Sequence, residues 1–560
     1  MTLKSRLRTG VALLGVLSVA SLASIIGGAA TPRFLPDDPI QVERDTEDAS
    51  GMRNHEPNLF VDFAYNTLTG GKPRSSPRAG NINTVDDLPD SSWFTNRRGL
   101  TAADVARGPN RSEGPAPGAW TVTSSKSDGV TPGFTVKDAN GQRWFLKFDP
   151  PGMRGMATGT EVAVTRLMWA LGYNVPENHI AYLRREQLVV GDGAKFTTAA
   201  GTTRGLRQGD IDQLLERAGR DADGRYRIVA SRALDGKPIG RIKFLGTRSD
   251  DPNDIVAHEH RRELRAYGTF AAWLNHVDAK SINSLDMLVT ENGRSFVKHY
   301  LIDFGSALGS GATEAAEYWA GSQYLVDGEQ VLSRMFSFGV NPPKWHSTAF
   351  YESPVIGRLP LHNAGFNPEG WKPREPNRAF LHARDDDKFW AADRLAGIRS
   401  DIIAAAVAAG EFGNAQDEAF LVRALAERRD AILRAYLPAV NPISAPSLAQ
   451  DGTLTFRNTA VDADVARRPE EYRGVFYAFN NTTGDAEFIG ESRSVDTVMP
   501  AVEGSLAGHE FVKVSLSATS HDHVAWDVAV DAYFQRTANG WRLVGFERMP
   551  EAPIRVTTTD

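Results

Sequence analysis

Apolar residues change their spacing along the chain, and each change predicts a different kind of element. Three short apolar runs bounded by turn residues predict strands at 120–124, 134–137 and 143–148. Asn140 and Gly141 lie between the last two runs and suit a hairpin turn. From 160 to 171 apolar and small residues alternate at helical spacing, and Gly172 ends the pattern. This part of the chain therefore predicts a hairpin followed by a helix.

The middle of the chain becomes increasingly helical in its pattern. Further strands and a long helix are predicted at 227–233, 239–245 and 255–275. Residues 387–437 carry apolar positions at amphipathic spacing, enough for two or three helices. A mostly β segment at 119–250 is thus followed by a mostly helical segment at 251–440.

The last part of the chain returns to strand-like alternation. Residues 528–536 and 541–548 alternate apolar and polar positions on either side of Asn539-Gly540, which is typical of a hairpin. We expect a separate antiparallel β domain at 441–560, a size typical of single domains. The predicted fold class is α+β.

The first 118 residues lack such periodicity. Residues 31–118 are rich in Pro, Gly, Asn and Asp with irregular apolar islands, which predicts an extended arm with a few anchor points. In 1–30, basic residues precede an apolar run at 11–26, and small residues follow it, as in an export signal. The alternative is an uncleaved anchor, although the run is at the short end of the roughly 20 residues that span a bilayer. We expect an exported protein, periplasmic, cell-surface or secreted, with membrane contact only through this segment.

Composition narrows the classes of partner. The chain has 560 residues, enough for two to four domains, and carries 63 basic and 69 acidic residues for a formal net charge of −6. No broad basic field is present, so nucleic acid is not an expected partner. The absence of cysteine excludes disulfides, a thiolate metal site and an acylated lipoprotein.

A motif in the helical segment carries the strongest chemical signal. The stretch 276–283 has the pattern H-x-D-x-K-x-x-N, with Asp278 as a candidate base, Lys280 as a candidate phosphate contact and Asn283 as a candidate Mg²⁺ ligand. Two strand patterns around an Asn-Gly pair follow, and Asp303 of Asp-Phe-Gly comes directly after them. Hard Mg²⁺ prefers such oxygen ligands. Loop, hairpin and Asp303 therefore form one contiguous unit suited to phosphoryl transfer.

The upstream sheet offers groups for nucleotide binding. Lys147 lies in an apolar strand, and Glu161 at the start of the next helix is a candidate partner that would hold the lysine over phosphates. The loop from Ser127 to Phe134 contains Gly129 and Gly133 as candidate phosphate-covering residues. It is not a G-x-G-x-x-G loop, and its proline removes one backbone donor.

Each of these residues also has a structural interpretation. Asp-Phe-Gly is commonly a turn after a strand, and Lys147 at a strand end can extend its amine to water. Glu161 in a first helical turn can complement the helix dipole. The histidines of 258–260 and the arginines of 261–265 are most simply placed on a solvated helix start and face. The combined spacing, rather than any single residue, favours a catalytic site.

Together these residues resemble the protein-kinase-like superfamily, and within it the atypical branches of HipA-like, CotH-like and phosphatidylinositol 3- and 4-kinase-like proteins. The resemblance covers about 120–309 and extends toward 437. It implies a two-lobed fold with ATP and Mg²⁺ between the lobes. By the same resemblance Lys147 binds the nucleotide with Glu161 as its helix partner, Asp278 is the catalytic aspartate, Lys280 contacts the phosphate, and Asn283 and Asp303 bind the metal. The Gly-rich loop is unorthodox and no Ala-Pro-Glu follows Asp303, which indicates an atypical member.

The sequence therefore predicts an exported kinase-like enzyme that transfers phosphate from ATP to a hydroxyl of a protein, lipid or small molecule. One alternative is a pseudokinase that serves as a binding scaffold at the cell surface. Another is transfer of AMP on the same fold. An exported hydrolase is less favoured, because the chain has no G-x-S-x-G elbow and no paired carboxylate spacing for glycoside chemistry.

Overall fold

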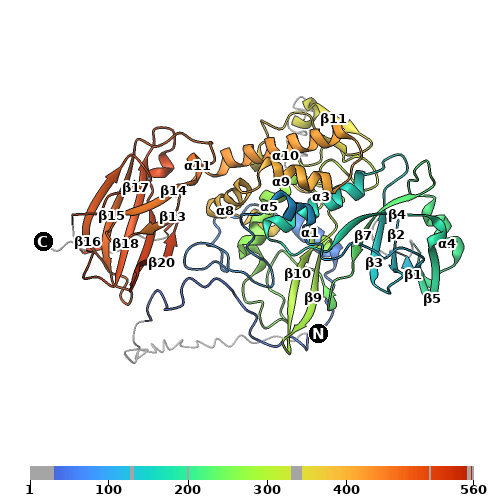
Figure 1. Cartoon of the computed structure of the whole chain (residues 1–560), viewed down its shortest axis with the longest axis horizontal. Coiled ribbons are helices and arrows are strands. Elements are labelled where there is room, and N and C mark those ends of the chain that lie inside the picture. The colour runs from blue at the N-terminus through green and yellow to red at the C-terminus, as the bar shows by residue number, and fades with distance from the viewer. Residues whose placement is uncertain are drawn as a thin grey trace, which may run out of the picture.

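The computed structural model describes residues 31–125, 132–198, 201–328, 343–503, 506–550 and 556–557. The predicted signal segment 1–30 lies outside this part of the chain. Figure 1 shows a sheet-rich lobe at one end, a helical lobe in the middle and a β domain at the other end. The predicted α+β class is confirmed, and the described chain forms two lobes followed by a mainly antiparallel C-terminal β domain.

Seven strands form the sheet of the first lobe. They are β1 (Trp120–Ser125), β2 (Gly133–Lys137), β3 (Arg143–Phe148), β4 (Asn178–Leu183), β5 (Leu188–Thr197), β6 (Thr203–Gly205) and β7 (Tyr226–Arg232), in the order β4-β7-β3-β2-β1-β5-β6. Only β1 and β5 pair in parallel. The predicted turn between β2 and β3 is present, with Gly141 at a φ of 79°.

Alternation along β3 assigns its side chains to two faces. Trp144, Leu146 and Phe148 are buried in the core of this lobe. Because successive side chains of a strand point to opposite faces, Lys147 lies on the other face. Helix α3 (Met156–Leu171) contacts β3, β4 and β7. The sheet therefore presents Lys147 away from its own core.

Helix α3 begins one turn earlier than the predicted residue 160. The carboxylate of Asp149 accepts hydrogen bonds from the backbone N–H groups of Gly155, Ala157 and Thr158 at 2.8 to 3.0 Å. These are first-turn donors that have no partner within the helix, so the carboxylate both caps the helix and complements its dipole. This capping extends the helix toward residue 156.

The second lobe is built from helices, one three-stranded sheet and one two-stranded ribbon. Its main helices are α5 (Arg262–Leu274), α7 (Arg378–Leu381), α8 (Asp385–Ala396), α9 (Ser400–Ala409) and α10 (Ala415–Tyr436). Its strands are β8 (Lys237–Gly240), β9 (Ser284–Glu291) and β10 (Arg294–Leu301) in one sheet, with β11 (Phe350–Ser353) and β12 (Gly357–Pro360) in a small ribbon. A further helix in the first lobe is α4 (Gln208–Leu215).

One strand and one helix in this region are shorter than the sequence predicts. The strand predicted at 239–245 ends at Gly240, whose φ of 125° is accessible to glycine and which lies against the backbone of His55. The helix predicted at 255–275 begins only at Arg262, because a 3-10 turn at His258–His260 and an extended Arg261 interrupt the chain before it.

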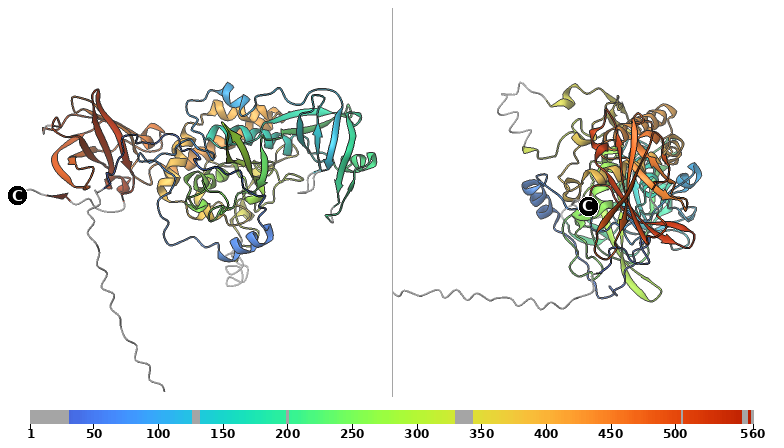
Figure 2. Two further views of the ribbon diagram at one scale, coloured as in Figure 1. Left: turned by 90° about the horizontal axis from the view of Figure 1, so that it is seen from below. Right: turned by 90° about the vertical axis from the view of Figure 1, so that its left-hand side faces the viewer.

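The arm wraps around both later parts of the molecule. It contains α1 (Leu59–Thr69) and α2 (Ala102–Arg107), and Trp93 and Phe94 are buried in the main core. At its start Phe34 packs against Phe479 and Tyr533 of the C-terminal domain. Figure 2 shows this arm passing from the β domain along the helical lobe. The arm therefore contacts both the helical lobe and the C-terminal domain.

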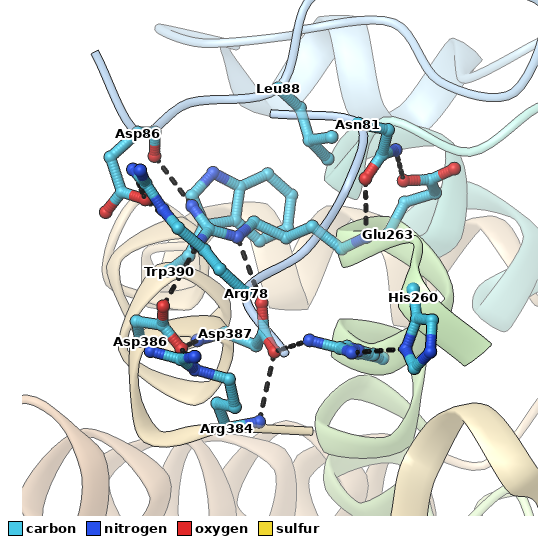
Figure 3. A network of polar contacts seen from close by, with 12 residues as sticks. Arg78, Asn81, Asp86, Leu88, His260, Glu263, Arg384, Asp386, Asp387 and Trp390 are labelled. Atoms are coloured by element: carbon cyan, nitrogen blue, oxygen red, sulfur yellow. Dashed lines mark hydrogen bonds and ion pairs between the residues drawn. The ribbon is translucent and has the colours of Figure 1, made fainter. Parts of the chain in front are cut away.

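A buried ionic network attaches the arm to α5 and α8 (Figure 3). Arg262 is fully buried and lies 3.0 Å from Asp86 of the arm and 3.1 Å from Asp387 of α8. Arg265 contacts the other oxygen of Asp387 at 2.9 Å. The solvated helix face expected for these arginines is wrong, because the arm covers it. His258, also expected in solvent, is buried and lies 2.8 Å from Asp254.

The C-terminal domain consists of two sheets, which are antiparallel except for the parallel pair of β16 and β21. A six-stranded sheet has the order β20-β19-β18-β15-β16-β21, and a three-stranded sheet has the order β13-β14-β17. The elements are β13 (Ile443–Leu448), β14 (Leu454–Asn458), α11 (Thr459–Asp462), β15 (Glu471–Phe479), β16 (Ala486–Ser494), β17 (Val498–Met499), β18 (Phe511–Thr519), β19 (Val530–Thr537), β20 (Gly540–Glu547) and β21 (Val556–Thr557). The predicted β19–β20 hairpin is confirmed.

Within the described ranges, no helix combines the length and the apolar character needed to cross a membrane.

Candidate active site

Three predicted residues from separate elements meet at one point. Lys147 on β3 places its Nζ atom 3.1 Å from Oε2 of Glu161 on α3 and 2.7 Å from Oδ1 of Asp303. The lysine side chain is 20% exposed and the aspartate 38% exposed, whereas Glu161 is buried. The lysine therefore links the sheet, the helix and the segment after the β10 strand, with an opening to solvent on the side of Asp303.

Charge keeps this lysine protonated. Burial alone would lower the pKa of Lys147, but the carboxylates of Asp303 and Glu161 outweigh it and raise the pKa above its usual value. A cation held by two carboxylates is ready to contact an anionic ligand if one carboxylate turns to another partner. Asp303 is the more exposed of the two and so is the one placed to do this.

Buried polar contacts fix Glu161. Its Oε1 atom lies 3.5 Å from Nδ2 of Asn178, which also donates to Oγ1 of Thr165 at 2.8 Å. Ser231 donates in turn to the Asn178 side chain at 2.5 Å. Because Asn178 and Glu161 are both buried, the carboxylate has little freedom to move. Asn178 was not predicted from the sequence, because a single polar residue at the start of a strand carries no distinctive signal.

The catalytic-loop motif forms a second cluster. Asn283 donates through Nδ2 to the backbone oxygen of Asp278 at 2.7 Å and to its Oδ2 at 2.8 Å. Lys280 places its Nζ atom 2.8 Å from Oδ1 of Asp278. Burial would raise the pKa of Asp278, but Lys280 and the hydrogen bonds lower it below its usual value. Asp278 is therefore ionised at neutral pH.

His276, at the start of the loop, packs between the loop and the segment after Asp303. His276 is completely buried, its Nδ1 lies 3.3 Å from the backbone oxygen of Ser306, and its ring contacts Phe304. Burial lowers the pKa of His276, so the ring is neutral at pH 7. We infer that it packs the loop against the Asp-Phe-Gly segment and does not act as an acid.

The hairpin brings the two clusters together. Strands β9 and β10 pair from Arg294 opposite Glu291 to Leu301 opposite Ser284, with a turn at Asn292 and Gly293 as predicted. The backbone N–H of Ile302 then donates to the backbone oxygen of Asn283 at 3.0 Å. The chain therefore leaves the hairpin beside the loop that precedes it.

Asp303 itself has an uncommon backbone conformation. Its φ is 61°, in the left-handed region that aspartate tolerates better than most residues. Strained conformations of this kind concentrate at functional sites. Gly305 follows, and a Cβ atom there would lie 3.5 Å from Oε2 of Glu161, so a larger side chain would approach the carboxylate.

The oxygen atoms of Asn283 and Asp303 are of the kind that binds a magnesium ion. Asn283 directs both contacts of its Nδ2 to Asp278, which leaves its Oδ1 as the atom suited to a hard cation, and Asp303 supplies a partly exposed carboxylate. Among the described residues no group of three His, Cys, Asp or Glu side chains is arranged to hold a metal. One carboxylate and one amide suit Mg²⁺ that takes its remaining ligands from phosphates and water.

Of the two glycines predicted to cover phosphates, the described residues include only Gly133. Gly133 begins β2 and pairs directly with Lys147 across the ladder, so its backbone lies beside the lysine. Gly129 lies outside the described residues. The two described clusters and Gly133 thus account for seven of the eight predicted positions.

A segment that the sequence analysis missed borders the loop. The backbone N–H of Arg374 donates to the oxygen of Val277 at 2.8 Å, and Asn377 donates to the oxygen of Ala279 at 3.3 Å. Between them Glu375 is partly buried. Burial raises its pKa to about 6, with Lys280 lowering it and Asp278 raising it, so its charge interacts with both loop residues. Only the tertiary fold shows this, because the residue is about 100 positions away.

Comparisons with known proteins give structural similarities alone. No family model and no curated protein matches the chain. A proinflammatory kinase CtkA of Helicobacter pylori is 12% identical, with 54% of this chain and 92% of that chain covered and a TM-score of 0.25. A Golgi casein kinase with Mn/ADP bound is 10% identical, with 71% and 95% covered and a TM-score of 0.29. A second structure of the Golgi casein kinase is 11% identical, with 71% and 96% covered and a TM-score of 0.22. The three branches that the sequence resembles stay predictions, and so does the kinase-like identity of the two lobes.

Proposed function

We propose that the protein is a phosphotransferase that binds ATP with Mg²⁺ and transfers phosphate to a hydroxyl group. The contact of Lys147 with both Glu161 and Asp303 carries this proposal, because it joins the sheet lobe to the segment that follows the catalytic loop. Phosphoryl transfer needs positioned charge more than covalent chemistry. A buried, fixed Glu161 beside a protonated lysine provides such positioning.

Each residue has a distinct role in this proposal. Lys147 contacts phosphate oxygens while Glu161 orients its amine. Asp278, ionised and held by Asn283, accepts a hydrogen bond from the substrate hydroxyl and orients it for attack. Lys280 stabilises charge on the transferred group. Asn283 and Asp303 would hold Mg²⁺, which supplies charge neutralisation when bound.

The substrate and the cellular compartment belong to the same proposal. The acceptor hydroxyl belongs to a protein, lipid or small molecule, and the N-terminal pattern favours export. A pseudokinase scaffold and an AMP transferase use the same fold and remain distinguishable by experiment. The ordered acid, amide and lysine around Asp278 favour an active enzyme over a scaffold.

The test is transfer of label by purified protein. With γ-labelled ATP and Mg²⁺ we expect label on the protein or on an added hydroxyl acceptor, and product mass should show one phosphate adduct. An AMP adduct, with label released as pyrophosphate, would support nucleotidyl transfer instead. Stabilisation by ATP without any transfer, and function unchanged in Asp278→Asn, would support the scaffold. Neither stabilisation nor transfer would overturn the proposal.

A further inference from the structure

A second cavity lies outside the candidate active site. It has a volume of about 510 Å³ and forms where the arm, the end of α3, the α8–α9 junction with α10, and the start of the C-terminal domain meet. In Figure 1 this is the region where the C-terminal domain adjoins the helical lobe. None of the predicted active-site residues lines it. Ligand pockets in proteins commonly have volumes of about 300–1,000 Å³, so the size suits a small metabolite.

The wall of this junction cavity is basic although the chain is acidic. Six arginines and three aspartates line it, while the whole chain has a formal net charge of −6. Four of the arginines have a carboxylate within 3.3 Å, in the pairs Arg98–Asp393, Arg399–Asp401, Arg429–Asp430 and Arg457–Asp462. Two arginines remain, Arg97 and Arg394, and their surroundings decide what the cavity attracts.

Arg394 is buried with incomplete hydrogen bonding. Its side chain is 3% exposed, and its Nη2 donates to Asn96 and lies 3.6 Å from Asp87. Its Nε and Nη1 atoms have no hydrogen-bond partner within the described part of the chain. Buried guanidinium donors without acceptors are costly, so this residue marks a place where an acceptor is missing.

Arg97 also lines the cavity, and its guanidinium donates to the backbone oxygens of Trp169 and Tyr173. Its Nη1 donates to the backbone oxygen of Trp169 at 2.9 Å, and its guanidinium lies over the Trp169 ring. Burial lowers the pKa of Arg97 to about 10, and burial together with the neighbouring Arg98 lowers that of Arg394 to about 10. An anion between these residues would reverse both effects.

A helix end adds to the positive potential. Helix α9 begins at Ser400, which lines the cavity, and its N-cap residue Arg399 makes no side-chain cap hydrogen bond. The N-terminal end of a helix carries partial positive charge and free backbone donors. Together with the two arginines it forms a site for an anion with several oxygens.

We propose that the junction cavity binds a small organic phosphate, with Arg97 and Arg394 as its phosphate-binding residues. A guanidinium group can donate two parallel hydrogen bonds to the oxygens of one phosphate. The carboxylates in the same cavity are already paired with other arginines, so they compete little for Arg97 and Arg394. The ligand would join the arm, the helical lobe and the C-terminal domain. The proposal does not depend on phosphotransferase activity, because it concerns separate residues.

Calorimetric titration of the full chain with pyrophosphate, without Mg²⁺ and at low salt, tests the proposal. We expect one site whose affinity falls at least tenfold in Arg97→Gln, with Arg468→Gln on the exposed surface of the C-terminal domain as the matched control. Lys147→Met should leave the affinity unchanged, which separates this cavity from the nucleotide site. A sugar bisphosphate that binds more tightly than pyrophosphate would identify the organic phosphate as the ligand.

A second variant keeps the test independent of folding defects. Ser400→Asp places a negative charge in the cavity while favouring the helix dipole, so it should keep or raise Tm and abolish pyrophosphate binding. Ser400→Asn, neutral and of similar size, should bind like the original protein. Absence of binding in the unsubstituted chain would overturn the proposal, and so would binding in Arg97→Gln and Ser400→Asp that is as tight as in the unsubstituted chain. Loss of binding in Lys147→Met alone would overturn it as well, because the ligand would then occupy the nucleotide site.

Discussion

The amine of Lys147 lies 2.7 Å from the carboxylate of Asp303, although the first residue belongs to the sheet lobe and the second follows the hairpin of the helical lobe. This ion pair crosses from one lobe to the other. Glu161 contacts the same amine from the side of the sheet, so the lysine is held by both lobes at once. Removing any of the three should therefore affect ligand binding as well as the chemistry.

Substitution of Lys147 by methionine tests the nucleotide contact. We expect transfer to fall by about 100-fold or more, because preorganised charge at a phosphoryl group typically contributes on this scale. ATP with Mg²⁺ should no longer raise Tm. Lys137→Met, on the exposed end of the neighbouring strand β2, is the matched control and should retain both properties. Equal activity in the two variants would contradict the assigned role.

Substitutions of Asp278 and Asp303 should distinguish the residue that acts as the base from the residue that binds the metal. Asp278→Asn should lose transfer by about 10²–10⁴-fold while ATP and Mg²⁺ still raise Tm, because only the orientation of the hydroxyl is lost. Asp303→Asn should lose the Mg²⁺-dependent part of that shift, because a hard cation binds an amide less well than a carboxylate. The matched control is Asp522→Asn in an exposed loop. If both active-site variants kept their Mg²⁺ response, Asp303 would not be a ligand.

The pH dependence of stability should show the effect of Glu375. Burial raises its pKa to about 6 in the folded protein, above its ordinary value near 4.5. The folded state therefore binds more protons than the unfolded state between these values, and the free energy of unfolding falls as pH rises through this window. The loss should be about 1 to 2 kcal/mol.

Glu375→Gln should remove that loss. Urea denaturation at pH 4.5 and pH 6.5 gives the difference for each protein, and the variant should lose less stability between the two values than the original chain. Glu487→Gln at an exposed position of β16 serves as the control. An identical pH response in the original protein and Glu375→Gln would show that this carboxyl titrates normally.

The buried ionic network should contribute strongly to stability. Asp387→Asn removes the charge that contacts both Arg262 and Arg265, and leaves two buried cations with one fewer counter-charge. We expect a loss of about 3–5 kcal/mol in the free energy of unfolding, measured in urea. Asp401→Asn, in an exposed pair with Arg399, should cost no more than about 1 kcal/mol. Similar costs for the two substitutions would show that burial of Asp387 is not decisive.

Much of the local architecture could be predicted from periodicity and turn residues. The hairpins at Asn140-Gly141, Asn292-Gly293 and Asn539-Gly540 are present, and the glycine of each pair has a positive φ, which glycine adopts without strain in a tight turn between twisted strands. Boundaries were less well predicted, as the late start of α5 at Arg262 shows. Capping and covering contacts from distant segments decide such ends.

The class of fold and the types of residue at the candidate site could be predicted from the sequence, because both depend on local spacing and on the chemistry of each side chain. Which of these residues meet depends on the tertiary fold, because the contacts of Lys147 and the burial of Arg262 involve segments far apart in the chain. Asn178, Glu375 and the junction cavity have no local pattern at all. They exist as features only because folding brings separate elements together, and burial then changes the energies of their charged and polar groups.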